Sequence, residues 1–568
     1  MSLDPIITKH VLKNAFDYGK PNAGSIVGKV IGEHPDAKKD MKATMAAIMK
    51  EVARVSKLSK ADIEKEMSKF VYVEKKEEEK GIDVPNAEDG KVIVRYPPEP
   101  NGWPHIGHAK AFCLSFAIAK RYHGKVLLRW DDTNPEAEKA EFLDAIRDGI
   151  TWLGIPWDEE KYCSDYLPKM YGLCGHLLEN GDAYSCSCKQ EDIAKGREQM
   201  KRCACGSRKP QQNITEWKRM LDGTAVEGSV IIRLRGDMES QNTVMRDPTL
   251  FRIISAPHYR QGTKYRVWPT YDFQGAVMDS ILNITHPIRS KEYELRDEAY
   301  VYLLKKLGLV VPQMISISRL AIKNAPISKR LLRPLVESGK LMGWDDPRMP
   351  TLAGMRRRGI LPQAIQEFVL SFGISKVESE PDLESLLSFN RKILDPEAKH
   401  YFFVSDPVEV DVSGLKEQKL TLKLHPKKEA GSQNSRDISV SGKVFISKSD
   451  ASQLKDGESF RLKDLCNVLV PKTGHGGNKL QGGIVPDDMV EKKVQWVSDG
   501  KLDCTVLVPK DLLGPDKEFD PKSLETIHGY CEPACADLNV GEIIQFERFG
   551  FCRLDKKEGK KLTFIFAC

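Results

Sequence analysis

The segment from residue 92 to residue 128 constrains the fold of this chain more than any other part of the sequence. An apolar, mostly β-branched run at Val92–Val94 precedes the loop Pro-Glu-Pro-Asn-Gly-Trp-Pro-His-Ile-Gly-His at residues 98–108. A helical pattern follows from about Ala109 to Tyr122, and a second apolar run occupies Val126–Leu128. This order predicts a strand, a loop, a helix and a second strand, which is the repeating unit of a parallel α/β sheet.

The start of the predicted helix has the chemistry of a phosphate site. A helix N-terminus presents unpaired backbone N–H groups and the positive end of the helix dipole. His105 and His108 are three residues apart and so share one helical face, and Gly107 lets a flat ligand approach the backbone. On these residues alone, a metal-binding pair and a chance spacing remain open as alternatives.

The complete string is far more specific than its two histidines. It closely resembles the His-Ile-Gly-His signature of class I aminoacyl-tRNA synthetases, and its Pro-Glu-Pro-Asn-Gly lead-in resembles the glutamyl/glutaminyl branch of that family. The resemblance covers about Lys91 to the C-terminus and is greatest to the archaeal type of glutamyl-tRNA synthetase. It implies that Glu99, Pro100 and Gly107 belong to an ATP site in which His105 and His108 take part in catalysis.

Length and composition set broad limits. A chain of 568 residues with 40% hydrophobic and 30% charged residues suits a globular protein of three to five domains. Its net charge of +6 fits a nucleic-acid-binding protein and an ordinary, slightly basic protein equally well. No membrane-length apolar stretch accompanies the motifs and no signal-peptide core opens the chain, so we expect a cytoplasmic protein without a membrane partner. The odd number of cysteines, thirteen, argues against a disulfide framework.

Shifts in composition divide the chain into six regions. The resemblance implies a multidomain α/β and β protein: a Rossmann-like class I synthetase catalytic domain with an inserted acceptor-binding domain, a helical connector and C-terminal anticodon-binding β-barrels. A change of composition near Val404 further suggests that the barrels fold apart from the catalytic core. The predicted regions are an N-terminal helical extension at 1–88 with a charged linker at 74–80, the first catalytic half at 89–183, the acceptor-stem insert at 184–267, the second catalytic half at 268–332, the connector at 333–403, and the barrels at 404–568.

A second signature is expected in the loop Pro-Ile-Ser-Lys-Arg at residues 326–330. A Ser-Lys-Arg tripeptide says little alone, but it follows the second α/β half, where class I synthetases have a mobile Lys-Met-Ser-Lys-Ser loop. By this resemblance Lys329 is a catalytic residue that meets the ATP phosphates. Attack of a carboxylate on ATP needs mainly positioning and stabilisation of phosphate charge, which imidazoles and a lysine can supply. The resemblance also places Ser290, Arg319, Leu320 and Ser328 in the ATP site.

Recognition of the amino acid is expected from residues that are distant in the sequence. By resemblance, Asp131 at the end of the second strand holds the substrate ammonium group, and Arg95 and Tyr271 line the same pocket. Each has a plain alternative when taken singly: a surface arginine, a carboxylate that caps a helix, a core tyrosine. Their order along one fold favours the functional interpretation.

By the same resemblance, Arg289 is expected to separate glutamate from glutamine. It stands where glutamyl-tRNA synthetases have an arginine for the γ-carboxylate and glutaminyl enzymes have a small neutral residue. A guanidinium matches a carboxylate fork and stays charged. The competing interpretation is a surface ion pair with Glu292. Gly275 matches neither the asparagine of bacterial glutamyl enzymes nor the histidine of glutaminyl ones, which leaves the finer pocket contacts open.

Two short cysteine pairs predict a metal site in the insert. Cys186 and Cys188 are followed after fourteen residues by Cys203 and Cys205, a spacing suited to a structural Zn²⁺. Four thiolates leave no open position, so a catalytic role for the metal is not expected; reduced, buried cysteines are the alternative. Further on, three adjacent arginines at 356–358 favour a contact with tRNA phosphates over a solvated face.

The resemblance therefore implies the activity of a glutamyl-tRNA synthetase, which uses ATP and Mg²⁺ to activate L-glutamate and transfers it to the 3′ end of tRNA(Glu). A glutaminyl-tRNA synthetase is the nearest alternative, and Arg289 argues against it. A non-catalytic tRNA-binding protein is a second alternative, which intact His105, His108, Lys329 and Asp131 oppose. The sequence leaves undecided whether tRNA(Gln) is also charged, which anticodon bases are read, what residues 1–88 do and which oligomer forms.

Overall fold

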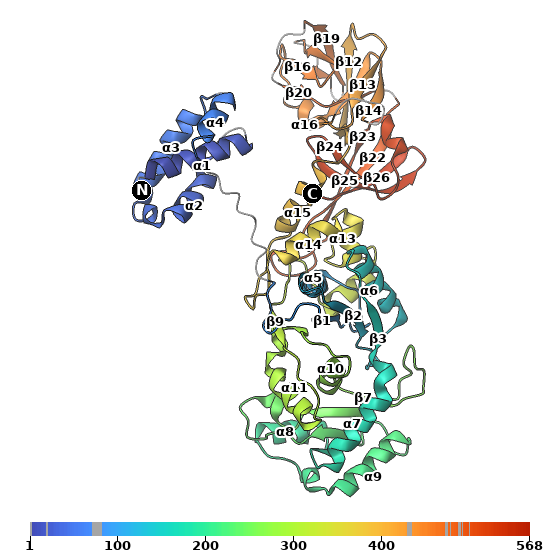
Figure 1. The fold of residues 1–568 in the computed structure, drawn as a ribbon. Helices are drawn as coiled ribbons and strands as arrows, with labels where there is room; N and C mark the ends of the chain where they lie inside the picture. The colour runs from blue at the N-terminus through green and yellow to red at the C-terminus, as the bar shows by residue number, and fades with distance from the viewer. Residues whose placement is uncertain are drawn as a thin grey trace. The chain divides into compact units, whose positions relative to one another are not determined.

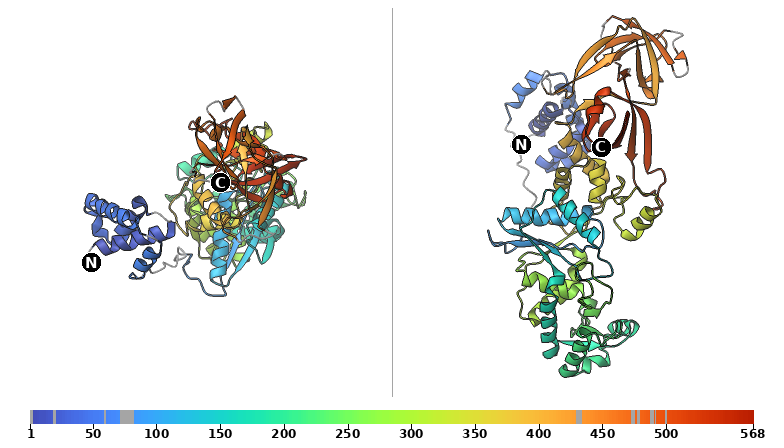
Figure 2. Two further views of the ribbon diagram at one scale, coloured as in Figure 1. Left: turned by 90° about the horizontal axis from the view of Figure 1, so that it is seen from above. Right: turned by 90° about the vertical axis from the view of Figure 1, so that its right-hand side faces the viewer.

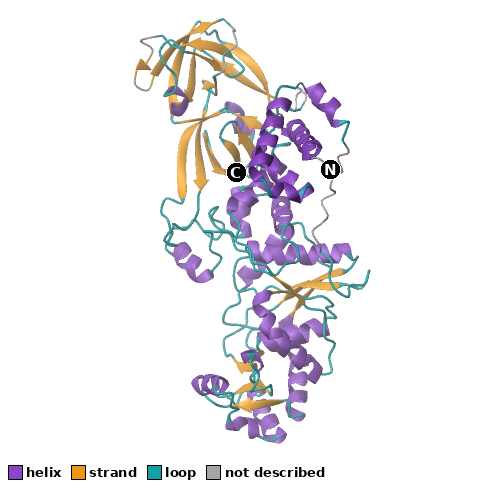
Figure 3. Cartoon of the chain, turned by 90° about the vertical axis from the view of Figure 1, so that its left-hand side faces the viewer, coloured by secondary structure: helices purple, strands orange, loops and turns teal. Residues whose placement is uncertain are grey.

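The chain divides into two compact units, Met1–Glu79 and Lys80–Cys568. The structure is a computed structural model, which describes residues 3–18, 21–58, 60–70, 82–428, 434–471, 475–476, 479–486, 490, 492–498 and 500–568. The predicted charged linker at 74–80 lies outside these residues. The regular elements described in the first unit are all helices, whereas those after about residue 400 are mostly strands (Figure 3). Within the described part of the chain, no helix combines the length and apolar character that a bilayer crossing requires.

In its described residues, the first unit is a bundle of four α-helices around an aliphatic core. These are α1 (Leu3–Tyr18), α2 (Ala23–Glu33), α3 (Met41–Val55) and α4 (Lys60–Met67) (Figure 1). Asn22 and Asp40 cap α2 and α3 by accepting hydrogen bonds from backbone N–H groups of the first turn. The predicted helical extension therefore ends earlier than residue 88, because Val84 already packs into the core of the second unit.

The predicted strand–loop–helix–strand unit is confirmed at the centre of the second unit. Parallel strands β1 (Ile93–Tyr96), β2 (Lys125–Trp130) and β3 (Glu159–Tyr162) form a sheet in that order, with Val94 opposite Val126 (Figure 1). The helices α5 (Ile106–Arg121) and α6 (Ala140–Trp152) belong to this half, and α5 packs against β1 and β2. A second parallel pair, β8 (Ile288–Ser290) and β9 (Ile315–Ile317), comes from the later half of the catalytic region.

The insert is built on an antiparallel sheet of four strands, β4 (Ala183–Cys186), β5 (Ile231–Leu234), β6 (Thr249–Ile253) and β7 (Val267–Pro269). It adds the helices α8 (Gln190–Glu198) and α9 (Pro210–Leu221). Its core is shared with helices before and after it in sequence, α7 (Leu167–Glu179), α10 (Tyr271–Ile281) and α11 (Glu294–Lys306). The insert therefore has no closed core of its own and is held rigidly to the catalytic half.

The connector consists of four helices, α12 (Lys329–Glu337), α13 (Leu352–Arg358), α14 (Pro362–Leu370) and α15 (Leu383–Leu394). Helix α14 packs on both α5 and α15, so the connector completes the core beneath the parallel sheet.

The C-terminal region forms two curled sheets (Figure 2). In the seven-stranded sheet the two end strands, β10 and β11, are separated along the chain by Phe402 alone. In the eight-stranded sheet the ends of the main path, β20 and β21, are separated by two residues. A sheet whose end strands are joined this closely must curl toward closure, which agrees with the predicted barrels. The seven-stranded sheet has the order β10 (His400–Tyr401), β24 (Ile543–Phe546), β25 (Gly550–Glu558), β26 (Lys561–Phe566), β22 (Leu502–Pro509), β23 (Leu524–Cys531) and β11 (Phe403–Ser405). The eight-stranded sheet has the order β20 (Lys493–Val494), β16 (Ser459–Leu462), β17 (Cys466–Leu469), β19 (Lys479–Val485), β12 (Pro407–Ser413), β15 (Lys443–Ser447) and β21 (Val497–Ser498), with β18 (His475–Gly476) beside β19. A separate pair is formed by β13 (Gln418–Lys423) and β14 (Ser435–Val440), and the short helix α16 (Lys448–Ala451) follows β15.

The expectation that the barrels fold apart from the catalytic core stays a prediction, because each curled sheet has a core cluster of its own while the seven-stranded sheet region also packs on the catalytic core. Residues 80–568 form one compact unit, and Phe551, Ala567 and Cys568 of the seven-stranded sheet region pack into the same core cluster as β1 and α5. A change in residue composition reflects the switch from helix to strand and carries no information on which faces are buried together.

The arginine triplet also differs from its predicted role. Arg357 donates two hydrogen bonds to Asp555 at 2.9 and 3.0 Å, and Arg358 is buried with its Nε bonded to the Ala567 carbonyl. Arg356 is exposed. Two of the three arginines therefore fasten α13 to the seven-stranded sheet and are not free for tRNA phosphates.

Candidate active site

A cavity of about 410 Å³ lies where the strands of the parallel sheets end. Its walls include residues at the carboxyl ends of β1, β2, β8 and β9, the edge at which parallel α/β folds bind ligands. Three predicted site residues, Pro100, Ser328 and Lys329, do not line it. The predicted residues that do line it are Arg95, Glu99, His105, Gly107, His108, Asp131, Tyr271, Arg289, Ser290, Arg319 and Leu320.

The two histidines cap the helix that opens at the cavity. Helix α5 begins at Ile106, three residues before the predicted start, because His105 is its N-cap. The Nδ1 atom of His105 accepts from the Gly107 N–H at 3.1 Å, and the Nδ1 atom of His108 accepts from the His105 N–H at 3.2 Å. Each neutral ring therefore carries its proton on Nε2, which remains available to donate to a ligand.

Both imidazoles are neutral near pH 7. Burial lowers the pKa of His108 to about 4, and burial together with the neighbouring His108 holds the pKa of His105 well below its usual value. The rings thus offer N–H donors to phosphate oxygens without needing to be protonated, and the helix N-terminus supplies the positive potential.

The loop that carries the histidines is fastened by a segment far along the chain. The Ile106 N–H donates to the Pro350 carbonyl at 3.1 Å, and the Leu352 N–H donates to the Pro104 carbonyl at 2.9 Å. The signature loop is therefore held from both sides as a rigid element, which suits a site whose task is to position phosphates.

Lys329 stands at the rim of the cavity. Its ammonium donates to both the carbonyl and the side-chain oxygen of Asn101, and Asn101 itself lines the cavity. Ser328 is exposed and precedes α12 without a capping hydrogen bond from its side chain. Pro100 is buried and its carbonyl accepts from the Lys139 N–H at 2.9 Å, which gives it a structural place beside the site.

Asp131 and Arg95 of the cavity wall belong to a buried network of alternating charges. Asp131 accepts two hydrogen bonds from Arg129, at 2.6 and 3.0 Å, and Arg129 also donates to Asp279 at 2.6 Å. Asp279 accepts from Arg95 at 2.9 Å and from the Tyr300 hydroxyl at 2.9 Å. All the charges in this chain of contacts are compensated, so Asp131 and Arg95 are held in fixed positions at the cavity wall.

Arg289 lies among aromatic rings and is not a surface residue. It is 6% exposed, and its guanidinium carbon lies 5.2–5.8 Å from the ring centres of Tyr271, Tyr293 and Tyr300. Its partner is Asp297 at 2.6 Å. The alternative pairing with Glu292 is wrong, because Glu292 instead accepts from Arg319. A small cavity of about 10 Å³ behind Tyr271 adjoins Arg289 and Gly275.

The four predicted cysteine ligands come together in the insert. All four sulfur atoms lie within 4.8 Å of one another, with Cys186 and Cys203 3.7 Å apart and Cys188 and Cys205 3.8 Å apart. Zinc–thiolate bonds of about 2.3 Å in a tetrahedron place sulfur atoms about 3.8 Å apart. The sulfur positions therefore fit a tetrahedral Zn²⁺ site.

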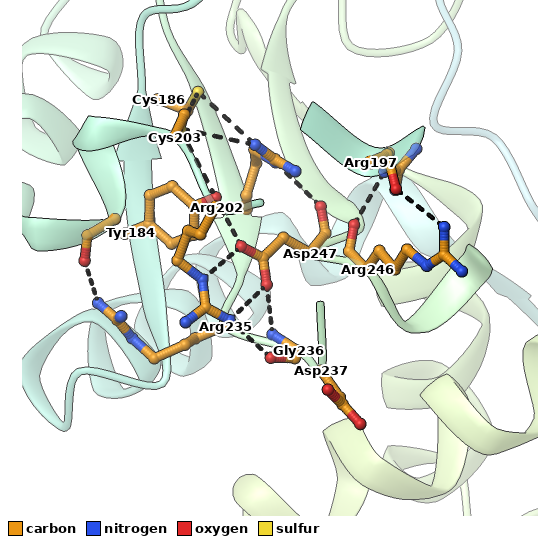
Figure 4. Close-up of polar contacts among 12 residues, drawn as sticks. Tyr184, Cys186, Arg197, Arg202, Cys203, Arg235, Gly236, Asp237, Arg246 and Asp247 are labelled. Atoms are coloured by element: carbon orange, nitrogen blue, oxygen red, sulfur yellow. Dashed lines mark hydrogen bonds and ion pairs between the residues drawn. The ribbon is translucent and has the colours of Figure 1, made fainter. Parts of the chain in front are cut away.

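The four thiols differ in how readily they ionise: burial raises the pKa of Cys186 and of Cys188, whereas hydrogen bonds from these two cysteines outweigh burial and lower the pKa of Cys203. The guanidinium of Arg233 lies 3.8 Å from Cys203 Sγ and 4.0 Å from Cys186 Sγ, and no carboxylate of the described residues forms an ion pair with it. Tyr184, whose hydroxyl lies 4.0 Å from Cys203 Sγ, is itself held by a neighbour: Asp247 accepts from Tyr184 at 2.8 Å and from Arg202 at 2.7 and 2.9 Å (Figure 4). A buried cation without another anion fits a metal–thiolate cluster, whose net charge is negative.

Sequence reasoning missed several residues of the site. Asp279 follows Tyr271 by eight residues on α10, so helical spacing placed both on one face. Arg129 precedes Asp131 by two residues, the period of a strand. Both spacings could therefore have pointed to Asp279 and Arg129 from the sequence alone. Asp297 and Lys110 carried no local signal, because their relation to the cavity depends on the packing of separate elements.

Known proteins match the whole chain. The family description "tRNA synthetases class I (E and Q), catalytic domain" matches residues 91–396, and two anti-codon binding domains of the same class match residues 398–483 and 493–555. The glutamate–tRNA ligase of Nitrosopumilus maritimus is 41% identical over 97% of both chains. The glutamate–tRNA ligase of Korarchaeum cryptofilum is 38% identical over 99% of this chain and 98% of its own. That of Pyrococcus abyssi is 36% identical over 100% of both chains.

Proposed function

Because the chain belongs to the class I aminoacyl-tRNA synthetases for glutamate and glutamine, we propose that the 410 Å³ cavity is its site of amino-acid activation. The protein is a glutamate–tRNA ligase. A carboxylate oxygen of L-glutamate attacks the α-phosphorus of ATP, and the bond to the β-phosphate breaks to release pyrophosphate. The terminal ribose hydroxyl of tRNA(Glu) then attacks the activated carbonyl, and AMP leaves.

At the phosphate end, the protein acts through fixed donors. The Nε2–H groups of His105 and His108 donate to phosphate oxygens as negative charge moves onto the leaving pyrophosphate. Lys329 exchanges its contact with Asn101 for the phosphates when ATP enters, since the two are competing acceptors for one ammonium. Mg²⁺ accompanies ATP in this family and neutralises phosphate charge when bound. Glu99, Gly107, Ser290, Arg319 and Leu320 line the remaining nucleotide side.

At the amino-acid end, opposite charges hold opposite ends of the substrate. Asp131 receives the ammonium group of glutamate through the lone pairs that Arg129 leaves free, with Arg95 and Tyr271 beside it. Arg289 receives the γ-carboxylate through N–H groups not used by Asp297. The tyrosine rings exclude water from this contact and so strengthen it.

The inserted sheet is proposed to hold one structural Zn²⁺ on Cys186, Cys188, Cys203 and Cys205. The metal would order the loop between β4 and α9, where side-chain packing is sparse, since α8 has no buried residue. We assign the region at 184–267 to the acceptor stem and the curled sheets to the anticodon, whose bases are read when unstacked. A cytoplasmic location is part of the same proposal.

The observation that carries the proposal is the convergence of eleven predicted residues, distant in sequence, on one cavity. The test is ATP–pyrophosphate exchange with tRNA present. We expect exchange to depend on L-glutamate and to fall at least tenfold in His108→Asn, which keeps an acceptor for the His105 N–H but loses the imidazole donor. Undiminished exchange in this variant would contradict the assigned role of the cavity.

A further inference from the structure

Lys110 is a buried cation that neither the proposed chemistry nor the ion pairs of the site account for. It lies on the second turn of α5, is 1% exposed, and lines the same cavity as His105 and His108. Its ammonium donates to the carbonyl and to the hydroxyl of Ser318, at 2.9 Å each. The ring of Phe372 covers it at 5.7 Å.

Lys110 differs from the other described cations of the cavity wall because it has no carboxylate partner. Arg95 pairs with Asp279, Arg289 with Asp297 and Arg319 with Glu292. Among the described residues no acidic side chain forms an ion pair with Lys110, and burial lowers the pKa of its ammonium group. Burying an uncompensated charge costs stability, so the value of this lysine must be sought in a ligand-bound state.

The partner of Lys110 begins the segment that carries two predicted nucleotide-site residues. Ser318 directly follows β9 and precedes Arg319 and Leu320, which line the cavity. The Ser318 N–H is itself bonded to the Ser375 carbonyl at 2.7 Å. The carbonyl of Leu320 lies close over Gly107, within 3.4 Å of the place a side chain there would start. Lys110 thus ties helix α5 to the backbone that crosses it.

We propose that Lys110 is a positioning residue for ATP: it fixes the segment 318–320 against α5 and holds a positive charge in a cavity built for an anionic ligand. The proposal rests on the proposed function, because that function assigns Arg319 and Leu320 to the nucleotide. Binding of the triphosphate brings negative charge into the cavity and offsets the buried ammonium. Lys110 therefore lowers the stability of the free protein and raises its affinity for ATP.

The test replaces Lys110 with methionine, which keeps the apolar stem and removes the charge. Lys110→Arg retains the charge, Ser318→Ala removes one of the two acceptors, and Lys120→Met changes an exposed lysine at the end of the same helix as a matched control. KM values for ATP and for glutamate come from pyrophosphate exchange with tRNA present. Melting temperatures are measured with and without ATP.

We expect Lys110→Met to raise KM for ATP at least about tenfold, the loss typical of a hydrogen bond to a charged group. KM for glutamate should stay within about twofold, and the melting temperature without ligand should be unchanged or higher. The shift in melting temperature on adding ATP should shrink in Lys110→Met, less so in Lys110→Arg, and not in Lys120→Met.

A lower melting temperature with an unchanged KM for ATP would overturn the proposal, because Lys110 would then be only a structural residue. An equal rise in both KM values would overturn it too. If Lys110→Met does not fold, Ser318→Ala decides by the same split between the two KM values. If the wild type itself lacks exchange, the proposed function fails, while the ATP-induced thermal shift still tests Lys110.

Discussion

Replacement of Arg289 should weaken the distinction between glutamate and glutamine. The two amino acids have nearly the same shape, so charge must separate them. Arg289 is 6% exposed and surrounded by tyrosine rings, which makes its charge effective at short range. Arg289→Ser removes the guanidinium and leaves Asp297 without its partner, so the double variant Arg289→Ser with Asp297→Asn is the cleaner perturbation.

The size of the effect follows from the existing ion pair. Losing one partner of a desolvated charged pair costs about 2–5 kcal/mol. Asp297 already compensates Arg289 at 2.6 Å and is itself 28% exposed, so a bound glutamine does not leave the guanidinium unpaired. We therefore expect the lower part of this range, about 2–3 kcal/mol, which corresponds to a roughly 30- to 150-fold fall in kcat/KM for glutamate.

The assay is pyrophosphate exchange with glutamate and with glutamine, each in the presence of tRNA. The double variant should lose most of its preference for glutamate, while KM for ATP should stay within about twofold. Arg260→Ser is the matched control, because Arg260 also pairs with a carboxylate at 2.6 Å and stacks on a tyrosine but does not line the cavity. An unaltered ratio of glutamate to glutamine in the double variant would refute the reasoning.

Two further predictions concern the metal and pH. Purified protein should contain about one zinc per chain, and Cys203→Ser should lose the metal and lower the melting temperature; elemental analysis well below one zinc with full stability would contradict the site. Burial raises the pKa of Glu138 to about 8, so its carboxyl group takes up a proton when the chain folds at a pH between about 4.5 and 8. The contribution of this group to the free energy of unfolding is complete below about pH 4.5 and is lost as the pH rises toward 8. The free energy of unfolding should therefore fall between pH 6.5 and 8.5, by up to about 1.4 kcal/mol per pH unit from this group, and less steeply in Glu138→Gln. Equal slopes in the two proteins would show that Glu138 does not titrate in this range.

Residues whose roles depend on local spacing could be predicted from the sequence. The sequence correctly predicted that a helix follows the signature loop with both histidines at its start, because one helix turn fixes their spacing. It also correctly predicted that the four cysteines come together, because each short pair brings two sulfur atoms to one place. Even here the helix start moved to Ile106, since a histidine acting as an N-cap through Nδ1 is not an ordinary capping residue.

Residues whose roles depend on packing could not be predicted. The partner of Arg289 is Asp297 on the following helix, and nothing in the sequence ranks it above Glu292. Arg357 and Arg358 form an apparently basic surface stretch, yet both are used to hold the seven-stranded sheet region. Hydrophobic patterning likewise indicated β-barrels, but not that the last residues of the seven-stranded sheet region pack into the catalytic core.

The most direct test of the account is the charging of purified tRNA by the purified full-length protein. Transcripts of tRNA(Glu) and tRNA(Gln) are incubated with ATP, Mg²⁺ and either labelled glutamate or labelled glutamine, and acid-precipitable label is counted. We expect ATP-dependent formation of glutamyl-tRNA(Glu), with no glutaminyl-tRNA formed on either transcript. Formation of glutaminyl-tRNA(Gln) in place of glutamyl-tRNA, or no charging of any transcript, would contradict this expectation.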